Sequence, residues 1–144
     1  MYTGFLHLHN TLRWLLLIVI VVTLVKYLMG WLGSKPWTKT DNLLGIVFTS
    51  LMDIQLLTGL VLYFFLSPVI KLAFSDFGAA MKDSELRFYA VEHILMMVVA
   101  VALVHVGRAK SKKAKTDKSK FKVAGIFFLI ALVVILAAIP WSRA

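Results

Sequence analysis

The stretch YAVEHILMMVVAVALVHVGR, residues 89–108, decides the fold class of this chain. It is almost entirely apolar over about 20 residues, the length that a helix needs to cross the hydrocarbon of a bilayer. It also contains Glu92, His93 and His105. Ionisable side chains inside a membrane cost free energy, and where they occur they mark functional positions. The stretch therefore predicts a membrane-spanning helix that carries part of a site.

The composition of the whole chain agrees with a membrane protein. Of its 144 residues 60% are hydrophobic, and the mean hydropathy is +0.87. Four segments are long and apolar enough to span a bilayer, and each must be helical because lipid offers the backbone no hydrogen-bond partner. We therefore predict an all-α, integral membrane four-helix bundle formed by residues 1–144 as a single domain. The expected spans are residues 5–31, 43–66, 86–106 and 123–141.

The beginning of the chain is expected to be a retained span rather than a signal peptide. A secretory signal has a basic region before a short apolar core, whereas this chain has no Lys or Arg before Arg13 and a longer apolar run. We expect Thr40 or Asp41 to cap the second span, and Asp83 or Ser84 to cap the third.

Charge in the connections predicts how the bundle is oriented. Eight of the 16 Lys and Arg lie in the expected basic loop 107–122, and Lys35 and Lys39 lie in the first connection. The positive-inside rule places both connections in the cytoplasm and both termini on the periplasmic side of a bacterial inner membrane. The basic loop is expected to contact anionic lipid rather than nucleic acid. In the second connection we expect a short interfacial helix that begins near Ser75.

The residue types present restrict the chemistry. The chain has no Cys, which excludes disulfides, thiolate metal sites and covalent attachment of haem through CxxCH. A metal would have to be held by His, Met or carboxylates. The sequence also has no nucleophile elbow, phosphate-binding glycine loop or HExxH. A redox carrier or a subunit is therefore favoured over an independent enzyme.

Three of the four histidines are expected at one depth. His7 and His9 lie in the first turns of the first span, and His93 lies about two turns into the third span from the same side. Two neutral imidazoles from facing helices are a common way to hold a b-type haem. His7 and His9 are about 200° apart on their helix, so only one of them can face inward. His93 with His9 is the preferred iron-ligand pair, because His9 is the deeper of the two, and His7 is the substitute.

Other residues in the same half of the bundle suit such a site. Arg13 and Arg87 are cations that could meet haem propionates, and Gly59 could let a flat macrocycle approach the backbone. Each has an alternative role. Arg13 could instead form an ion pair with Glu92, and Gly59 could mark a close helix crossing.

Two further ionisable residues have no place in a single bis-histidine site. His105 lies toward the opposite end of its helix, and it could serve a second haem only with a ligand from outside the chain, for example across a homodimer interface. Asp53 lies near the middle of the second span. It is either a proton relay or quinone contact, or a neutral acid hydrogen-bonded to Thr49 or to another helix. The hydrogen-bonded acid is favoured.

Several segments resemble a family of small four-span inner-membrane proteins of Bacteroidota that are labelled cytochrome b. They are LHLHNTLRW (6–14), IQLLTGLVLYF (54–64), RFYAVEHILMMVVAVALVHVGRAKSKKA (87–114) and the closing IPW (139–141). The resemblance covers nearly the whole chain. It implies a membrane protein that binds haem b, and it points to His7, His9, His93 and His105.

The leading hypothesis is a membrane electron-transfer protein with one bis-histidine haem b, to which a quinol could supply electrons. The alternative is a cofactor-free accessory or assembly subunit of a larger membrane complex. A third possibility is a proton or ion pathway that uses Asp53, Glu92, His93 and His105. The expected partners are membrane lipids, with a quinone, a larger membrane complex or a second copy of the chain as further candidates.

Overall fold

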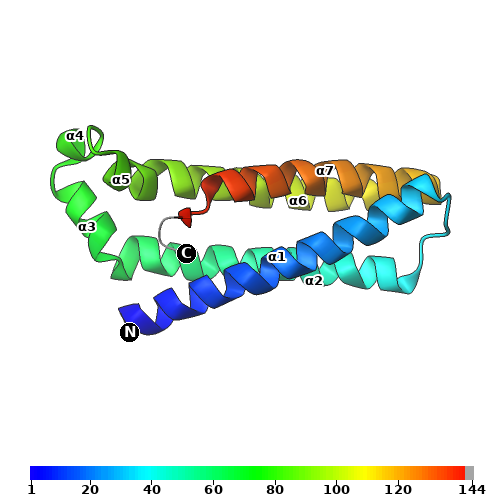
Figure 1. Ribbon diagram of the computed structural model, residues 1–144, viewed down its shortest axis with the longest axis horizontal. Coiled ribbons are helices and arrows are strands. Elements are labelled where there is room, and N and C mark those ends of the chain that lie inside the picture. The colour runs from blue at the N-terminus through cyan, green and yellow to red at the C-terminus, as the bar shows by residue number, and fades with distance from the viewer. Residues whose placement is uncertain (142–144) are drawn as a thin grey trace.

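The computed structural model describes residues 1–141 and places most of them in helices (Figure 1). Two of the long helices are continued by π-helical segments, in which the hydrogen bonds run from residue i to i+5. One such segment, η1, follows α2, and the other, η2, precedes α6. The long elements are α1 (Tyr2–Leu32), α2 (Lys39–Val61) with η1 (Leu62–Leu66), η2 (Phe88–Glu92) with α6 (His93–Lys113), and α7 (Asp117–Ala138).

Four continuous helical segments are long and apolar enough to cross a membrane. They are Tyr2–Leu32, Lys39–Leu66, Ser84–Lys113 and Asp117–Ala138. Large apolar side chains are exposed along all of them, as on a surface that faces lipid. Residues 1–141 contain no strand. The prediction of an all-α chain with four long apolar helices is therefore confirmed, and it indicates a multi-pass membrane protein.

The four long helices lie side by side, and each packs mainly against two others (Figure 1). α1 contacts α2 and α7, and α6 contacts the same two helices. Aromatic rings fill much of the interior: the ring of Phe128 lies 4.9 Å from that of Phe48 and 5.8 Å from that of Tyr27. α1 passes close to Phe121 at Gly30, where a Cβ would stand 2.5 Å from the ring. These buried rings fix the middle and one end of the bundle.

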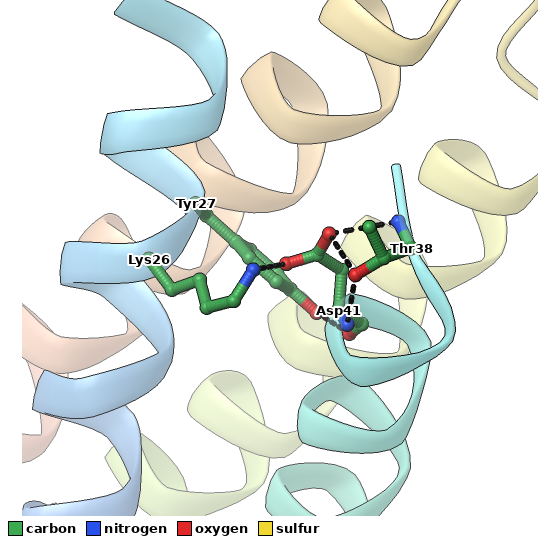
Figure 2. A network of polar contacts seen from close by, with 4 residues as sticks. All are labelled: Lys26, Tyr27, Thr38 and Asp41. Carbon is green, nitrogen blue, oxygen red and sulfur yellow. Dashed lines mark hydrogen bonds and ion pairs between the residues drawn. The ribbon is translucent and has the colours of Figure 1, made fainter. Parts of the chain in front are cut away.

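The connection between α1 and α2 is fixed by a network around Asp41 (Figure 2). Thr38, not Thr40 or Asp41, is the N-cap of α2, so the predicted cap was wrong. The Asp41 carboxylate accepts hydrogen bonds from the backbone N–H and the hydroxyl of Thr38, at 2.8 and 2.9 Å. Its other oxygen lies 2.6 Å from Nζ of Lys26. Asp41 therefore occupies position N3 of a capping box whose N-cap is Thr38.

The second connection contains three short helices, α3 (Pro68–Ser75), α4 (Phe77–Ala80) and α5 (Ser84–Arg87). The helix expected to begin near Ser75 ends there instead. It begins at Pro68 because the Ser67 side chain accepts from the N–H of Ile70 and proline suits the first helical position. Asp83 is the N-cap of α5, and it is one of the two residues predicted to cap the third span.

Most of the expected basic loop 107–122 is helical. α6 continues to Lys113 and α7 begins at Asp117, so Ala114–Thr116 alone connect them. Lysine has a high helix propensity, and a run of lysines therefore does not end a helix. We call this end of the bundle the basic end. The opposite end, where α1 begins and α3 to α5 lie, is called the cavity end (Figure 1).

Candidate functional site

A cavity of about 440 Å³ opens at the cavity end, between the start of α1, the end of α2 with η1, the region around His93, and the end of α7. This volume lies in the range of small-molecule and cofactor sites. Most of its lining is apolar. The polar and glycine residues of the lining that the sequence singled out are His9, Arg13, Gly59 and His93.

His9 on α1 and His93 on α6 both line this cavity, and their rings lie edge to face. Their ring centroids lie 6.4 Å apart, and the ring planes are at 80° to one another. Within residues 1–141 no group of three or more His, Asp or Glu is arranged to hold a metal ion. The site therefore offers a pair of imidazoles.

The tautomer of His93 is set by the end of α7. Nδ1 of His93 lies 2.7 Å from the carbonyl oxygen of Ala138, in the last turn of that helix. The last carbonyls of a helix have no partner within the helix, and a carbonyl oxygen can only accept. Nδ1 therefore carries the hydrogen and donates it, and the lone pair of the neutral ring is on Nε2. Metal-ligating histidines are held in this way.

His9 is held against α2 by Thr58. Nδ1 of His9 lies 3.1 Å from Oγ1 of Thr58, and the same hydroxyl lies 2.9 Å from the carbonyl of Gln55. When the single hydroxyl hydrogen is donated to the Gln55 carbonyl, Oγ1 accepts Nδ1–H of His9 and the lone pair of the ring is on Nε2, which is the tautomer that a metal ligand needs. The side chain of Gln55 also donates to the backbone carbonyl of His9 at 2.8 Å, so that the α1 backbone is fixed at this turn.

Gly59 and Arg13 border the same two imidazoles. A Cβ at position 59 would stand 3.2 Å from Cε1 of His9, so the ring lies directly over the glycine. Nε of Arg13 is buried and has no hydrogen-bond partner among residues 1–141. An unpaired buried polar group is costly, and a cation more so. Arg13 therefore presents an unused donor in the cavity wall.

The expected ion pair between Arg13 and Glu92 does not form. Glu92 is bound instead by Arg87, with 2.6 Å between Oε1 and Nε. Arg87 precedes η2 and Glu92 ends it, so the two are five residues apart along a π-helical turn and lie on the same side of it. Arg87 also donates to the carbonyl of Met81 and is not part of the cavity lining.

Both π-helical segments lie beside the cavity. Leu62 and Tyr63 of η1 and Tyr89 of η2 contribute to its wall. The two segments are joined by the hydroxyl of Tyr63, which donates to the carbonyl of Ala90 at 2.6 Å. Single π-helical turns inside α-helices are frequent at functional sites. Their position here agrees with a site in this cavity.

The remaining histidines lie elsewhere. His7 is exposed on α1 and does not line the cavity. His105 on α6 binds Asp53 on α2, with 2.6 Å between Nε2 and Oδ1. Asp53 thus bonds to another helix, which was one of its two expected partners. The other, Thr49, donates to the carbonyl of Gly45 in its own helix.

Sequence reasoning missed the parts that hold the two rings in place. Thr58 and Gln55 were visible as polar residues in an apolar span, three residues apart and next to Gly59. That spacing places them on one face of α2, and it could have suggested a polar contact with another span. The carbonyl of Ala138 carries no signal in the sequence, because any residue supplies a carbonyl.

Comparison of the chain with protein-family models, with curated proteins and with solved structures finds no match. The resemblance to cytochrome b-labelled proteins therefore stays a prediction. What the fold and the cavity define is a class: a multi-pass helical membrane protein with a cofactor-sized cavity at one end of its helices.

Proposed function

We propose that this protein is a membrane electron-transfer protein that binds one haem b between His9 and His93. The observation that supports it most directly is the pair itself. Two imidazoles from α1 and α6 line one cavity with their centroids 6.4 Å apart, and in each ring Nδ1 is engaged by a neighbouring helix, through the carbonyl of Ala138 for His93 and the hydroxyl of Thr58 for His9.

The spacing of the two rings fits a metal held between them. A ligating nitrogen lies about 2 Å from its metal, so two imidazoles on opposite sides of one ion have centroids about 6 Å apart. The observed separation is 6.4 Å. Two protein ligands are fewer than the four of a structural zinc site, whereas haem iron takes only its axial ligands from the protein.

The rest of the lining fits the other parts of a haem. The absence of a side chain at Gly59 makes room for the His9 ring itself, which a larger residue would displace from its place as a ligand. The unpaired Nε of Arg13 is a donor for a carboxylate such as a propionate. Arg87, the other expected propionate contact, is already paired with Glu92.

A bound haem would supply one-electron transfer. The chain's own residues define which chemistry is favoured. Because His9 and His93 would fill both axial positions, iron would have no open position for oxygen. Thr58 and the carbonyl of Ala138 would hold the rings in place when the iron charge changes. Arg13 would offset the negative charge of a carboxylate.

The location follows from the same proposal. With the lysines of the basic end in the cytoplasm, the cavity end and the haem lie near the periplasmic face of the inner membrane. A quinol is then a suitable electron donor because it diffuses within the bilayer. The alternative is a cofactor-free accessory subunit of a larger complex. The two proposals differ in a property that can be measured, since a cofactor-free subunit is colourless and a haem protein is not.

The test is the optical spectrum of protein purified from cells that are supplied with haem. We expect sharp b-type bands on reduction and no change when carbon monoxide is added, because His9 and His93 would both ligate the iron. His93→Ala opens one position, so this variant either loses the haem or binds carbon monoxide. A colourless wild-type protein, or a wild-type spectrum that shifts with carbon monoxide, contradicts the proposal.

A further inference from the structure

Asp53 and His105 form a polar pair on the outer surface of the bundle. Nε2 of His105 lies 2.6 Å from Oδ1 of Asp53, and the two side chains are 48% and 47% exposed. Asp53 lies near the middle of the candidate span Lys39–Leu66, so lipid headgroups are out of its reach. Ionisable side chains at this depth face the interior of a bundle or a partner, since hydrocarbon cannot hydrate them.

Each member of the pair has one polar atom left over. Oδ2 of Asp53 and Nδ1 of His105 have no hydrogen-bond partner within residues 1–141. In a neutral pair or an ion pair that shares one proton along the Nε2–Oδ1 bond, Nδ1 keeps a hydrogen and Oδ2 keeps a lone pair. The surface therefore offers one donor and one acceptor at the same level of the bundle.

The pair sits in two exposed rows of residues with the same spacing. On α2 the row is Ile46, Ser50, Asp53 and Leu57, and on α6 it is Val98, Ala102, His105 and Ala109. Each row repeats at four, three and four residues, which keeps it on one face of its helix. Both rows have a small residue one turn from the polar one, namely Ser50 and Ala102. Small residues allow helices to approach closely in a membrane.

We propose that this face, defined by the two rows, binds a second copy of this chain in a two-fold symmetric dimer. A two-fold interface brings the same patch of both copies together, so it must be self-complementary. The patch formed by the two rows is self-complementary, because its spare donor and its spare acceptor lie at one level. An axis along the bundle places Nδ1 of each His105 opposite Oδ2 of the partner's Asp53 and removes both from lipid. The proposal does not depend on haem.

The absence of Cys from the chain makes the test direct, since introduced Cys residues are the only thiols present. In the proposed dimer the α2 row of one copy faces the α6 row of the other. Because α2 and α6 run in opposite directions, Ser50 and Ala109 both lie about one turn from the polar pair, on the side of the basic end. Ser50→Cys and Ala109→Cys chains that carry different tags are therefore co-expressed, and we expect a mixed disulfide-linked dimer after mild oxidation of native membranes. Ile18→Cys co-expressed with Ala109→Cys is the control, because Ile18 is 62% exposed near the middle of α1, which belongs to neither row, and we expect at least five-fold less dimer.

Two further variants link the dimer to the polar pair. Asp53→Leu with His105→Leu removes both groups together, leaves no unpaired partner in the monomer, and should lower cross-linking between the Ser50→Cys and Ala109→Cys chains at least five-fold. Val98→Trp tests the same face through bulk, with the polar pair intact, and should have the same effect. Circular dichroism confirms that each variant is helical.

Three outcomes overturn the proposal. One is a wild-type protein that is monomeric by light scattering in mild detergent, together with no mixed dimer from the Ser50→Cys and Ala109→Cys chains in membranes. Another is equal cross-linking at Ile18→Cys, which would mean random collision. The third is undiminished dimer in both the double-leucine and the Val98→Trp variants. None of these outcomes depends on haem content, so this proposal and the proposed function fail separately.

Discussion

The ring of His9 lies directly over the α-carbon of Gly59, where an added Cβ would stand 3.2 Å from Cε1 of the ring. α1 and α2 therefore meet at the level of the candidate site with no side chain between the imidazole and the α2 backbone. The close approach also places Thr58, the neighbour of Gly59, within hydrogen-bond distance of Nδ1 of His9. Gly59 thus provides the space for the His9 ring and allows the contact with Thr58 that orients the ring.

Filling that space should displace His9. Gly59→Leu adds a branched side chain against the ring, and overpacking of a filled site costs about 1–3 kcal/mol unless the ring moves. We expect the variant to fold and to lose most of its haem, measured as absorbance of the reduced b-type band per chain. Gly4→Leu is the control, because a Cβ at Gly4 would meet nothing within 4 Å. Full haem content in Gly59→Leu would mean that no ligand depends on this contact.

Removing the hydroxyl that orients His9 should weaken the site without destroying it. Thr58→Val keeps the shape of the side chain and removes the acceptor for Nδ1–H. Loss of such a supporting contact lowers affinity about 10–100-fold, so haemin titration of the apoprotein should give a correspondingly higher Kd. Thr49→Val on the same helix is the matched control, because its hydroxyl donates to carbonyls of α2 and it does not line the cavity. Equal affinities for the two variants would argue against Thr58 as a support.

Arg13 should influence the charge of the bound group. Arg13→Met keeps much of the side-chain length and removes a cation whose Nε has no partner. Because a nearby positive charge favours the reduced, less positive iron, its loss should lower the reduction potential in a redox titration. Arg87→Met is the comparison, since Arg87 is paired with Glu92 outside the cavity lining, and it should leave the potential closer to that of the wild type. A larger change of the reduction potential in Arg87→Met than in Arg13→Met would mean that Arg87, and not Arg13, lies near the bound group.

The network at Asp41 should contribute to stability and not to ligand binding. Asp41→Ala removes the acceptor for Lys26 and for the backbone N–H of Thr38 (Figure 2). These contacts lie at the basic end of the bundle, opposite the cavity end (Figure 1). Loss of a helix cap together with a buried acceptor should destabilise the fold by about 2 kcal/mol, seen as a lower Tm in detergent. The haem spectrum should not change. Asp117→Ala, an exposed acidic residue in the first turn of α7, should have a much smaller effect on the Tm.

Hydropathy was sufficient to predict the four apolar helices, because the need to satisfy backbone groups in lipid leaves no other structure for such segments. Hydropathy did not predict where these helices begin and end. The basic segment after Gly107 continues α6 as far as Lys113, since lysines are good helix formers and Gly107 packs against Phe127 instead of ending the helix. The N-cap of α2 is Thr38, two residues before Thr40 and three before Asp41, the two predicted caps, because Asp41 binds back to Thr38.

Depth along the helices was enough to bring His9 and His93 into one group before the structure was known. It could not assign the partner of Glu92, because that depends on a π-helical turn, which has no sequence signature comparable to a cap. It also could not pair Asp53 with His105. Counted along the expected spans, Asp53 and His105 lie at different depths. In the structure their side chains nevertheless meet, because side chains lean along the helix axis.

The most direct test of the account is the number of haems per chain, measured by the pyridine haemochrome assay on protein purified from haem-supplied cells. We expect one haem per chain in the wild type and in His7→Ala, whose side chain is exposed outside the cavity. In the double variant His9→Ala with His93→Ala we expect none. A wild-type protein without haem, or a double variant that retains its full haem content, would contradict ligation by His9 and His93.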